Sequence, residues 1–175
     1  MPGKDRPAWN IVVEPLLQYF KESYILAEWQ SGEYSISTDI ARLDVPLIHD
    51  YLSKHSYWAQ GRSLEVVRRA IQNSLNFGVF RQSQQIGFAR VVTDYATFAW
   101  LADVFVLEEY RGHGLSKWLM EIIMSHPELQ GFRRWVLATH DAHELYRRYG
   151  FTDLQDPSRW MEKFREVPTT IPGIN

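Results

Sequence analysis

The chain has 175 residues, of which 45% are hydrophobic and 23% charged, as in an ordinary soluble globular protein with one sizeable core. The formal net charge of −2 gives no overall field that would attract nucleic acid. The absence of cysteine excludes disulfides, thiolate metal sites and a cysteine nucleophile.

The N-terminal segment differs from the rest of the chain. Residues 1–7 have no apolar stretch behind a basic patch, so they do not form a signal peptide. The weakly polar run over 96–107 is too short to cross a bilayer, and we therefore expect a cytoplasmic protein with no membrane partner. Helical spacing in the first segment, carried by Leu16, Leu17, Phe20, Tyr24 and Ala27, predicts a helix that ends before Ser31. We expect an extension over 1–33 that packs on its own domain or on a partner, a main domain over 34–166 and a tail over 167–175.

From Tyr34 onward, short strands and helices are mixed. Alternation predicts a strand over 34–38, and helices are expected over 45–55 and, behind the N-cap Ser63, over 64–74. Strands are expected over 77–81, 86–94 and 98–106, the first two joined by a hairpin turn over 82–84.

The second half predicts a strand–helix–strand crossover. Apolar residues from Leu115 to Ile123 repeat as in a helix packed on a sheet, and Pro127 ends it. A strand over 135–139 follows, and Asp141 is expected to cap a short helix that stops at Gly150. Closing strands are expected over 151–154 and 159–164. The order predicts an α/β domain with a mixed sheet flanked by helices.

A glycine-rich loop between the strand over 98–106 and the next helix is the most informative feature. Gly112, Gly114 and Ser116 are small, so a ligand can approach the backbone closely, and Arg111 adds a positive charge. The N–H groups that open a helix are unpaired, and the helix dipole favours an anion there. The loop matches neither a dinucleotide fingerprint nor a Walker loop well, so a phosphorylated ligand and a plain tight turn both remain open.

A second segment favours the ligand. Leu145-Tyr146 lies on the next short helix after the loop with Arg111, Gly114 and Ser116, and Gly150-Phe151 follows after three further residues. Together, in this order, the two segments resemble the GNAT superfamily of acyl-CoA N-acyltransferases. The resemblance covers about residues 34–164. It implies a mostly antiparallel sheet in which two parallel strands, here 98–106 and 135–139, splay apart around the pantetheine arm of acetyl-CoA.

The resemblance also implies which residues hold the cofactor. Backbone groups of Phe105 and Val106 would pair with the arm, and Thr139 stands where many members carry an asparagine that contacts it. The pyrophosphate would lie on the loop formed by Arg111, Gly112, His113, Gly114, Leu115 and Ser116.

Two residues are predicted to act in catalysis. By resemblance, Tyr146 faces the departing sulfur. A free tyrosine titrates near pKa ~10 and a thiol near ~8.5, so a hydrogen bond to the thiolate is favoured over complete proton transfer. Asp103, on the strand beside the acetyl group, is a candidate to orient the amine or relay its proton. Bonding to a backbone amide is the alternative role for Asp103.

The resemblance also implies that the acceptor site lies near the loop between the first and second helices. Tyr57, Trp58 and Arg62 lie there, and Arg90, Tyr95 and His140 are placed near the same cleft. Aromatic groups and arginines suit a small molecule with a flat or acidic part, and a role for Tyr57 and Trp58 as loop anchors remains the alternative. His140 and His143 do not have metal-ligand spacing with a third ligand, so no metal is expected.

The sequence therefore predicts an enzyme, an N-acetyltransferase acting on the primary amine of a small molecule or a protein. A homodimer is compatible with the sequence. A catalytically silent acyl-CoA-binding module remains the alternative, and nucleotide binding at the same loop is a third.

Overall fold

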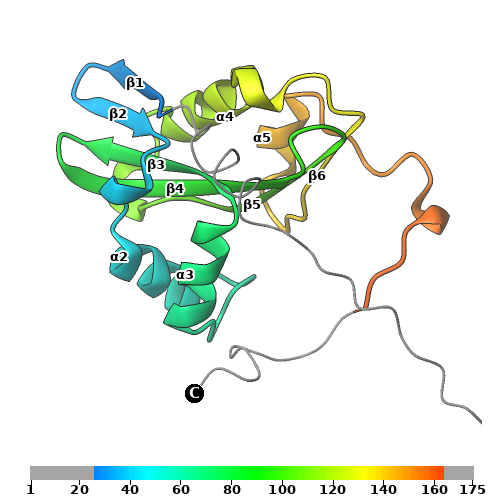
Figure 1. The fold of residues 1–175 in the computed structure, drawn as a ribbon, viewed down its shortest axis with the longest axis horizontal. Coiled ribbons are helices and arrows are strands. Elements are labelled where there is room, and N and C mark those ends of the chain that lie inside the picture. Colours follow the sequence, from blue (N-terminus) through cyan, green and yellow to red (C-terminus); the bar gives the residue numbers. More distant parts are fainter. Residues whose placement is uncertain (1–25, 164–175) are drawn as a thin grey trace, which may run out of the picture.

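The computed structural model describes residues 26–163, which form a six-stranded sheet covered by helices on both faces (Figure 1). The strands lie in the order in which they occur in the chain. They are β1 (Glu28–Ser31), β2 (Tyr34–Ser37), β3 (Leu75–Arg81), β4 (Gln84–Thr93), β5 (Phe98–Val106) and β6 (Arg134–Val136). Neighbouring strands are antiparallel except β5 and β6, which are parallel. The predicted mixed, mostly antiparallel sheet is confirmed.

Side-chain hydrogen bonds cap the starts of α2 and α3. Asp44 accepts a hydrogen bond from the N–H of Leu47 at 3.0 Å and starts α2 (Val45–Asp50), which continues as a π-helical turn over Tyr51–His55. Ser63 accepts from the N–H of Val66 at 3.4 Å and starts α3 (Leu64–Gln72), as the sequence predicts. The remaining helices are α4 (Leu115–Ser125) and α5 (His143–Arg147).

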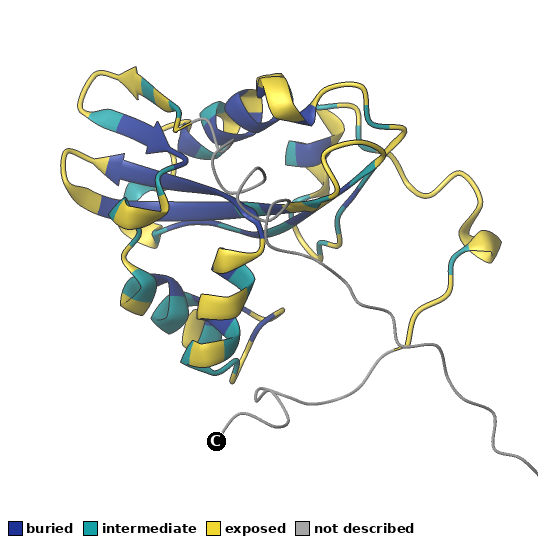
Figure 2. Cartoon of the chain, viewed as in Figure 1, coloured by how far each residue is buried: buried dark blue, intermediate teal, exposed yellow. Residues whose placement is uncertain are grey.

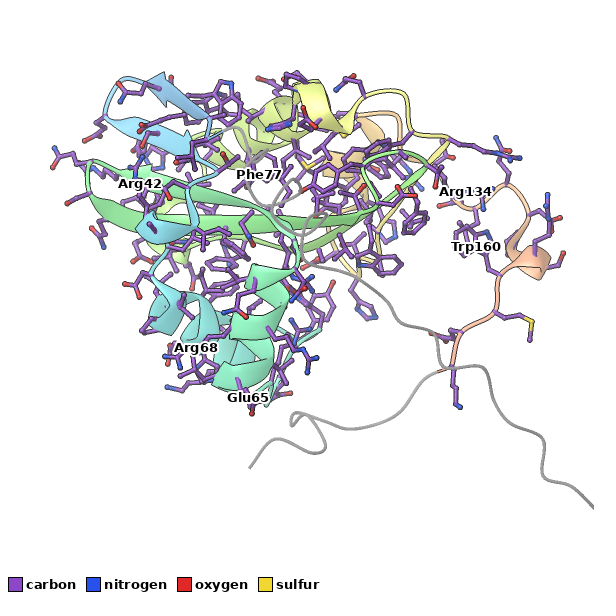
Figure 3. All side chains as sticks on the ribbon, in the orientation of Figure 1. Arg42, Glu65, Arg68, Phe77, Arg134 and Trp160 are labelled. Carbon is purple, nitrogen blue, oxygen red and sulfur yellow. The ribbon has the colours of Figure 1, made fainter. Side chains whose placement is uncertain are left out.

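Two apolar clusters lie on opposite faces of the sheet. The larger one includes Phe77 and Met120, between the sheet and α4, and Figure 3 shows the Phe77 side chain inside this layer. The smaller one joins α2 and α3 to Phe88 and Phe105 on the other face. Figure 2 shows that buried residues follow the strands while the outer sides of the helices are exposed. The central strands of the sheet are therefore buried on both faces where these helices cover them.

The first strand corrects the N-terminal expectation. Residues 28–31, assigned to the extension and to a helix, form β1, which pairs with β2. The Ser31-Gly32 pair, interpreted as a helix end, is a hairpin turn in which Gly32 has a φ of +60°. Trp29 then packs on Phe77, which favours the strand over the helix. The rest of the predicted helix lies outside the described residues.

The C-terminal part departs most from the prediction. β6 ends at Val136 instead of Thr139, and Asp141 does not cap α5, because Ala142 holds the cap position without a side-chain hydrogen bond. The closing strands over 151–154 and 159–163 do not form. This segment leaves the body of the domain, with a single 3-10 turn over Pro157–Arg159 (Figure 1). Residue 164 lies outside the described range.

A side-chain contact accounts for part of the course of this segment. The Arg134 guanidinium lies 4.9 Å from the centre of the Trp160 ring, and Figure 3 shows both side chains beyond the end of the sheet. Side-chain stacking thus holds residue 160 near β6 in place of backbone pairing. None of the helices between residues 26 and 163 has the length and apolar character needed to span a membrane.

Candidate functional site

The three residues of β6 pair in parallel with the N-terminal end of β5 only. Their matched residues are Phe98 with Arg134, Ala99 with Trp135 and Trp100 with Val136. Beyond these pairs, the described residues show no further ladder between the two strands, while β5 continues to Val106. The strands therefore diverge as the resemblance implies. Each presents backbone N–H and C=O groups that an extended ligand can pair with.

A bulge in β5 lies inside this divergent part. Phe88 pairs with Phe105 and Arg90 with Ala102, so β5 has one residue more than β4 between the two pairs. Asp103 occupies this stretch with a φ of +53°, a left-handed conformation that aspartate tolerates better than most residues. A bulge bends a strand and redirects its side chains, and here it turns Asp103 toward the α3 side of the sheet.

The loop after β5 has the geometry of an anion site. Gly112 and Gly114 have φ values of +82° and +80°, and a Cβ at either would meet no atom within 4 Å. Gly114 begins α4 without a side-chain cap, and its carbonyl accepts from the N–H groups of Lys117 and Trp118 at 3.0 Å. Among the described residues we find no acceptor for the backbone N–H groups of 112–116. The loop is thus open, with unpaired backbone donors at the start of α4, the arrangement that binds anions at helix N-termini.

Arg111 is anchored beside this loop. Its Nε donates to the carbonyl of Val106 at 3.2 Å and its Nη2 to the hydroxyl of Tyr51 at 3.1 Å. Tyr51 also stacks on Phe105, with ring centres 3.8 Å apart. The sequence gave no sign that the Tyr51 hydroxyl holds Arg111. The contact fixes a positive charge at the end of β5.

Tyr146 on α5 is buried, with 8% of its surface exposed. Burial, and to a lesser extent nearby Tyr57 and Asp141, raises its pKa to about 12, so the phenol keeps its proton throughout the physiological range. We find no acceptor for its hydroxyl among residues 26–163. It lines a cavity of about 370 Å³ together with β6, the loop after β6 and the 151–157 segment. The hydroxyl is therefore a free hydrogen-bond donor next to an open space.

Thr139 serves the start of α5. Its Oγ1 accepts a hydrogen bond from the N–H of Ala142 at 3.1 Å. Thr139 therefore binds a backbone N–H at the start of the helix, a role expected of Asp141. Thr139 also lines the cavity next to Tyr146.

Asp103 is enclosed by donors. Nη1 of Arg62 lies 2.9 and 3.1 Å from its two oxygens, Nε of Arg90 lies 2.6 Å from Oδ2, and Nε1 of Trp58 lies 3.2 Å from Oδ1. Only 3% of the carboxylate side chain is exposed. The bulge, β4 and the loop before α3 thus meet at one charged centre.

The loop before α3 also reaches across to the loop after β6. The Tyr57 hydroxyl accepts from the N–H of His140 at 2.6 Å. The Tyr57 ring lies 5.4 Å from the His140 ring and meets Trp58 edge-on at 4.9 Å. Of the side chains proposed for the acceptor, Tyr57, Trp58, Arg90 and His140 therefore belong to one connected group, which Arg62 joins through Asp103.

Comparison with known proteins decides the family. The acetyltransferase (GNAT) domain family matches residues 73–153. A Gibberella zeae protein named as an acetyltransferase is 30% identical to this chain. The match covers 73% of this chain and 84% of that protein. The chain belongs to the GNAT acetyltransferase family.

Solved structures agree with this assignment. A GNAT-family structure from Xanthomonas campestris pv. campestris is 54% identical and superposes with a TM-score of 0.74, over 75% of this chain and 93% of that one. A GNAT acetyltransferase from Elizabethkingia anophelis, solved with acetyl-CoA bound, shares the fold at 15% identity and a TM-score of 0.53, over 70% of this chain and 78% of that one. The splayed strands, the open loop and Tyr146 of this GNAT chain thus lie in an acetyltransferase fold.

Proposed function

We propose that this GNAT protein transfers the acetyl group of acetyl-CoA to a primary amine by direct attack. The observation that carries the proposal is the set of free backbone donors over 112–116, next to two strands that diverge after three paired residues. An extended, diphosphate-bearing molecule matches both features, because the loop binds an anion and the strand edges pair with an amide-containing arm.

The residues of the chain divide the work. N–H groups of Gly112, His113, Gly114, Leu115 and Ser116 hold the pyrophosphate, with Arg111 adding charge at its edge. Backbone groups of Phe105 and Val106 pair with the arm of the acyl donor. Thr139 lies on the loop after β6, across the arm from Phe105 and Val106.

The reaction forms a C–N bond and breaks a C–S bond. The neutral amine attacks the thioester carbonyl carbon, the sulfur leaves as a thiolate, and the amine proton passes to water. Tyr146 donates a hydrogen bond to the departing sulfur. Because its pKa of about 12 lies well above that of a thiol, near ~8.5, it stabilises the thiolate without giving up its proton.

A thiol-release assay tests the proposal. The full chain is incubated with acetyl-CoA and a panel of small amines and lysine peptides, and free coenzyme A is followed with time, with a no-acceptor control. Acceptor-dependent release supports the proposal. Tight binding of acetyl-CoA without turnover on any acceptor would instead favour an acyl-CoA-binding module, and displacement by ATP or NAD would favour a nucleotide site.

A further inference from the structure

The charged centre on the α3 side of the sheet carries more positive than negative charge. Two guanidinium groups, Arg62 and Arg90, share the single carboxylate of Asp103. Within the described part of the chain, neither arginine lies within ion-pair distance of a second carboxylate. One positive charge therefore remains uncompensated.

This charge lies in a largely desolvated place. The side chain of Arg62 is 22% exposed and that of Arg90 only 14%. Removing a cation from water costs free energy unless an anion or enough acceptors replace the water. The structure thus retains a costly surplus charge at a site where a simple one-to-one ion pair would fold at lower cost.

The guanidinium groups also have donors left over. Arg62 uses Nη1 on Asp103, while Arg90 uses Nε on Asp103 and Nη1 on the hydroxyl of Ser74 at 3.2 Å. For the Nη2 groups of both arginines we find no acceptor in residues 26–163. Each guanidinium carries five N–H donors in a planar fork, which suits the oxygens of a carboxylate or phosphate. Asp103 thus binds both guanidinium groups, and each keeps N–H donors that are available to another acceptor.

The surroundings fit a ligand with an apolar part. Val92 and Trp100 form the next cross-strand pair on the same face, two residues beyond the pair Arg90–Ala102. Their surfaces are 38% and 39% exposed. The helices α2 and α3 cover Phe88 and Phe105 but not this end of β4 and β5, which projects past α3 (Figure 1). Trp58, also partly exposed, borders the arginines. An apolar floor therefore adjoins the surplus charge.

A chain of contacts joins this place to the loop after β6. Asp103 contacts Trp58, Trp58 packs on Tyr57, and Tyr57 accepts from the backbone N–H of His140 in the loop after β6. The charged centre and the loop after β6 are thus linked through Trp58 and Tyr57.

The geometry points to an acceptor that carries an anionic oxygen group, a carboxylate or a phosphate, bound by Arg62 and Arg90. Asp103 is then a positioning residue that aims the two guanidinium groups and does not take the amine proton. This inference rests on the proposed acetyltransferase function. It narrows the acceptor to amines such as amino acids, carboxylate-bearing peptides or aminoalkyl phosphates.

Matched acceptor pairs test it. Amino acids with increasing separation of amine and carboxylate, aminoalkyl phosphates, and alkylamines of equal length are compared by kcat/KM in the thiol-release assay. We expect the best anionic acceptor to exceed its uncharged partner at least 10-fold, and the carboxylate and phosphate arms to identify which group is bound. Equal kcat/KM for charged and uncharged partners would overturn the inference while leaving the acetyltransferase function intact.

Variants locate the effect. Arg62→Gln and Arg90→Gln should each reduce the preference for the anionic acceptor about 10-fold, mainly through KM, and Arg→Lys at either position should restore only part of it because the fork is lost. Arg68→Gln is the matched control, since Arg68 lies exposed on α3 near Glu65 and away from the sheet (Figure 3). An unchanged preference in both variants at positions 62 and 90 would contradict the assignment.

Calorimetric titration with N-acetylated amino acids from the same series measures binding independently of turnover. If no amine is acetylated and acetyl-CoA does not bind, the proposed function fails. The anion site is then judged by this binding alone, measured on folded wild type and on Arg90→Lys. Binding that weakens in the variant supports the site, and no binding to wild type overturns it.

Discussion

At the scale of single residues, Gly114 has two tasks that only glycine combines. Its φ of +80° turns the backbone so that the following N–H groups point outward, and its missing side chain leaves the space in front of them empty. Arg111 and Tyr51 fix the neighbouring charge. The loop therefore depends on backbone shape more than on side-chain chemistry.

Gly114→Trp should abolish coenzyme A binding, because the indole would fill the approach to the N–H groups. The matched control is Gly131→Trp, which also places a side chain at positive φ, +77°, with no atom within 4 Å, but in the loop before β6. Both variants should lose similar stability, on the order of 1–2 kcal/mol. Calorimetric affinity should fall at position 114 alone, and equal affinity in the two variants would contradict the loop's role.

Tyr146→Phe should lower turnover on the order of 10²-fold with little change in affinity for coenzyme A, since the ring contact with Phe151 is retained and only the hydroxyl is lost. Tyr149→Phe is the control on the same segment, because its hydroxyl donates to the carbonyl of Lys117 on α4. Single-turnover rates with saturating acceptor give the measurement. Equal rates in wild type and Tyr146→Phe would remove the role from Tyr146.

The raised pKa of Tyr146 also predicts alkaline behaviour. The pKa of this tyrosine is near ~10 in the unfolded chain and about 12 in the folded protein. Its contribution to the free energy of unfolding is therefore fully present below pH 10 and is lost as the pH rises toward 12. Between pH 9 and pH 11, wild type should lose about 1 kcal/mol more free energy of unfolding than Tyr146→Phe. Urea titrations at both pH values measure the difference, and parallel losses would show that the phenol is not buried in solution.

At the scale of elements, the bulge in β5 connects three parts of the fold. Asp103 lies on β5, Arg90 on β4, and Arg62 and Trp58 on the loop before α3. The sequence identified Asp103 and Arg90 as site residues, but treated β5 as a regular strand. In a regular strand, alternation alone would decide the face of the sheet on which the side chain of residue 103 lies. The extra residue of the bulge changes that face and therefore its neighbours.

Asp103→Asn should destabilise the fold by about 3 kcal/mol, since it leaves two part-buried guanidinium groups without a carboxylate. KM for the acceptor should rise more than kcat falls. Asp50→Asn is the control, because it removes an exposed ion pair with Lys54. A variant of unchanged stability that loses only kcat would show that Asp103 acts on the amine proton.

At the scale of the whole molecule, His126 joins the sheet to the end of α4. It is buried, its ring meets Trp29 and Phe77 edge-on at 5.9 and 5.6 Å, and its Nδ1 accepts from the N–H of Glu128. Its Nε2 is buried without a partner among the described residues. Burial lowers the pKa of His126, so the folded protein holds it neutral.

Acid should therefore weaken the fold through His126. The stability due to the neutral ring is present above the unfolded pKa, near ~6.5, and is lost as pH falls through the lower folded pKa. His126→Asn keeps a side chain able to cap the N–H of Glu128 and removes the titration. Wild type should lose more free energy of unfolding than this variant between pH 7.5 and 5.5, and identical losses would contradict the prediction.

Local patterns predicted most of the central fold. The strand over Phe98–Val106 has the bounds expected from its apolar run, and the helix from Leu115 follows from its spacing. The left-handed Gly150 after α5 was also expected. These features are set by residues close together in the chain, so the sequence states them directly.

Where elements meet, local patterns were insufficient. Residues 28–31 became a strand because an edge of β2 was available, and residues 151–163 remained outside the sheet despite strand-like composition. Strand pairing depends on a partner distant in sequence, which no local pattern contains.

The sequence by itself determined the family, the glycine turn before α4 and the placement of Tyr146 on a short helix, because each depends on a short local motif. Only the tertiary structure decided that Arg62, Arg90 and Trp58 converge on Asp103. Their contact depends on a one-residue bulge and on a loop crossing the sheet, and chain folding alone brings residues 58, 62, 90 and 103 within hydrogen-bond distance.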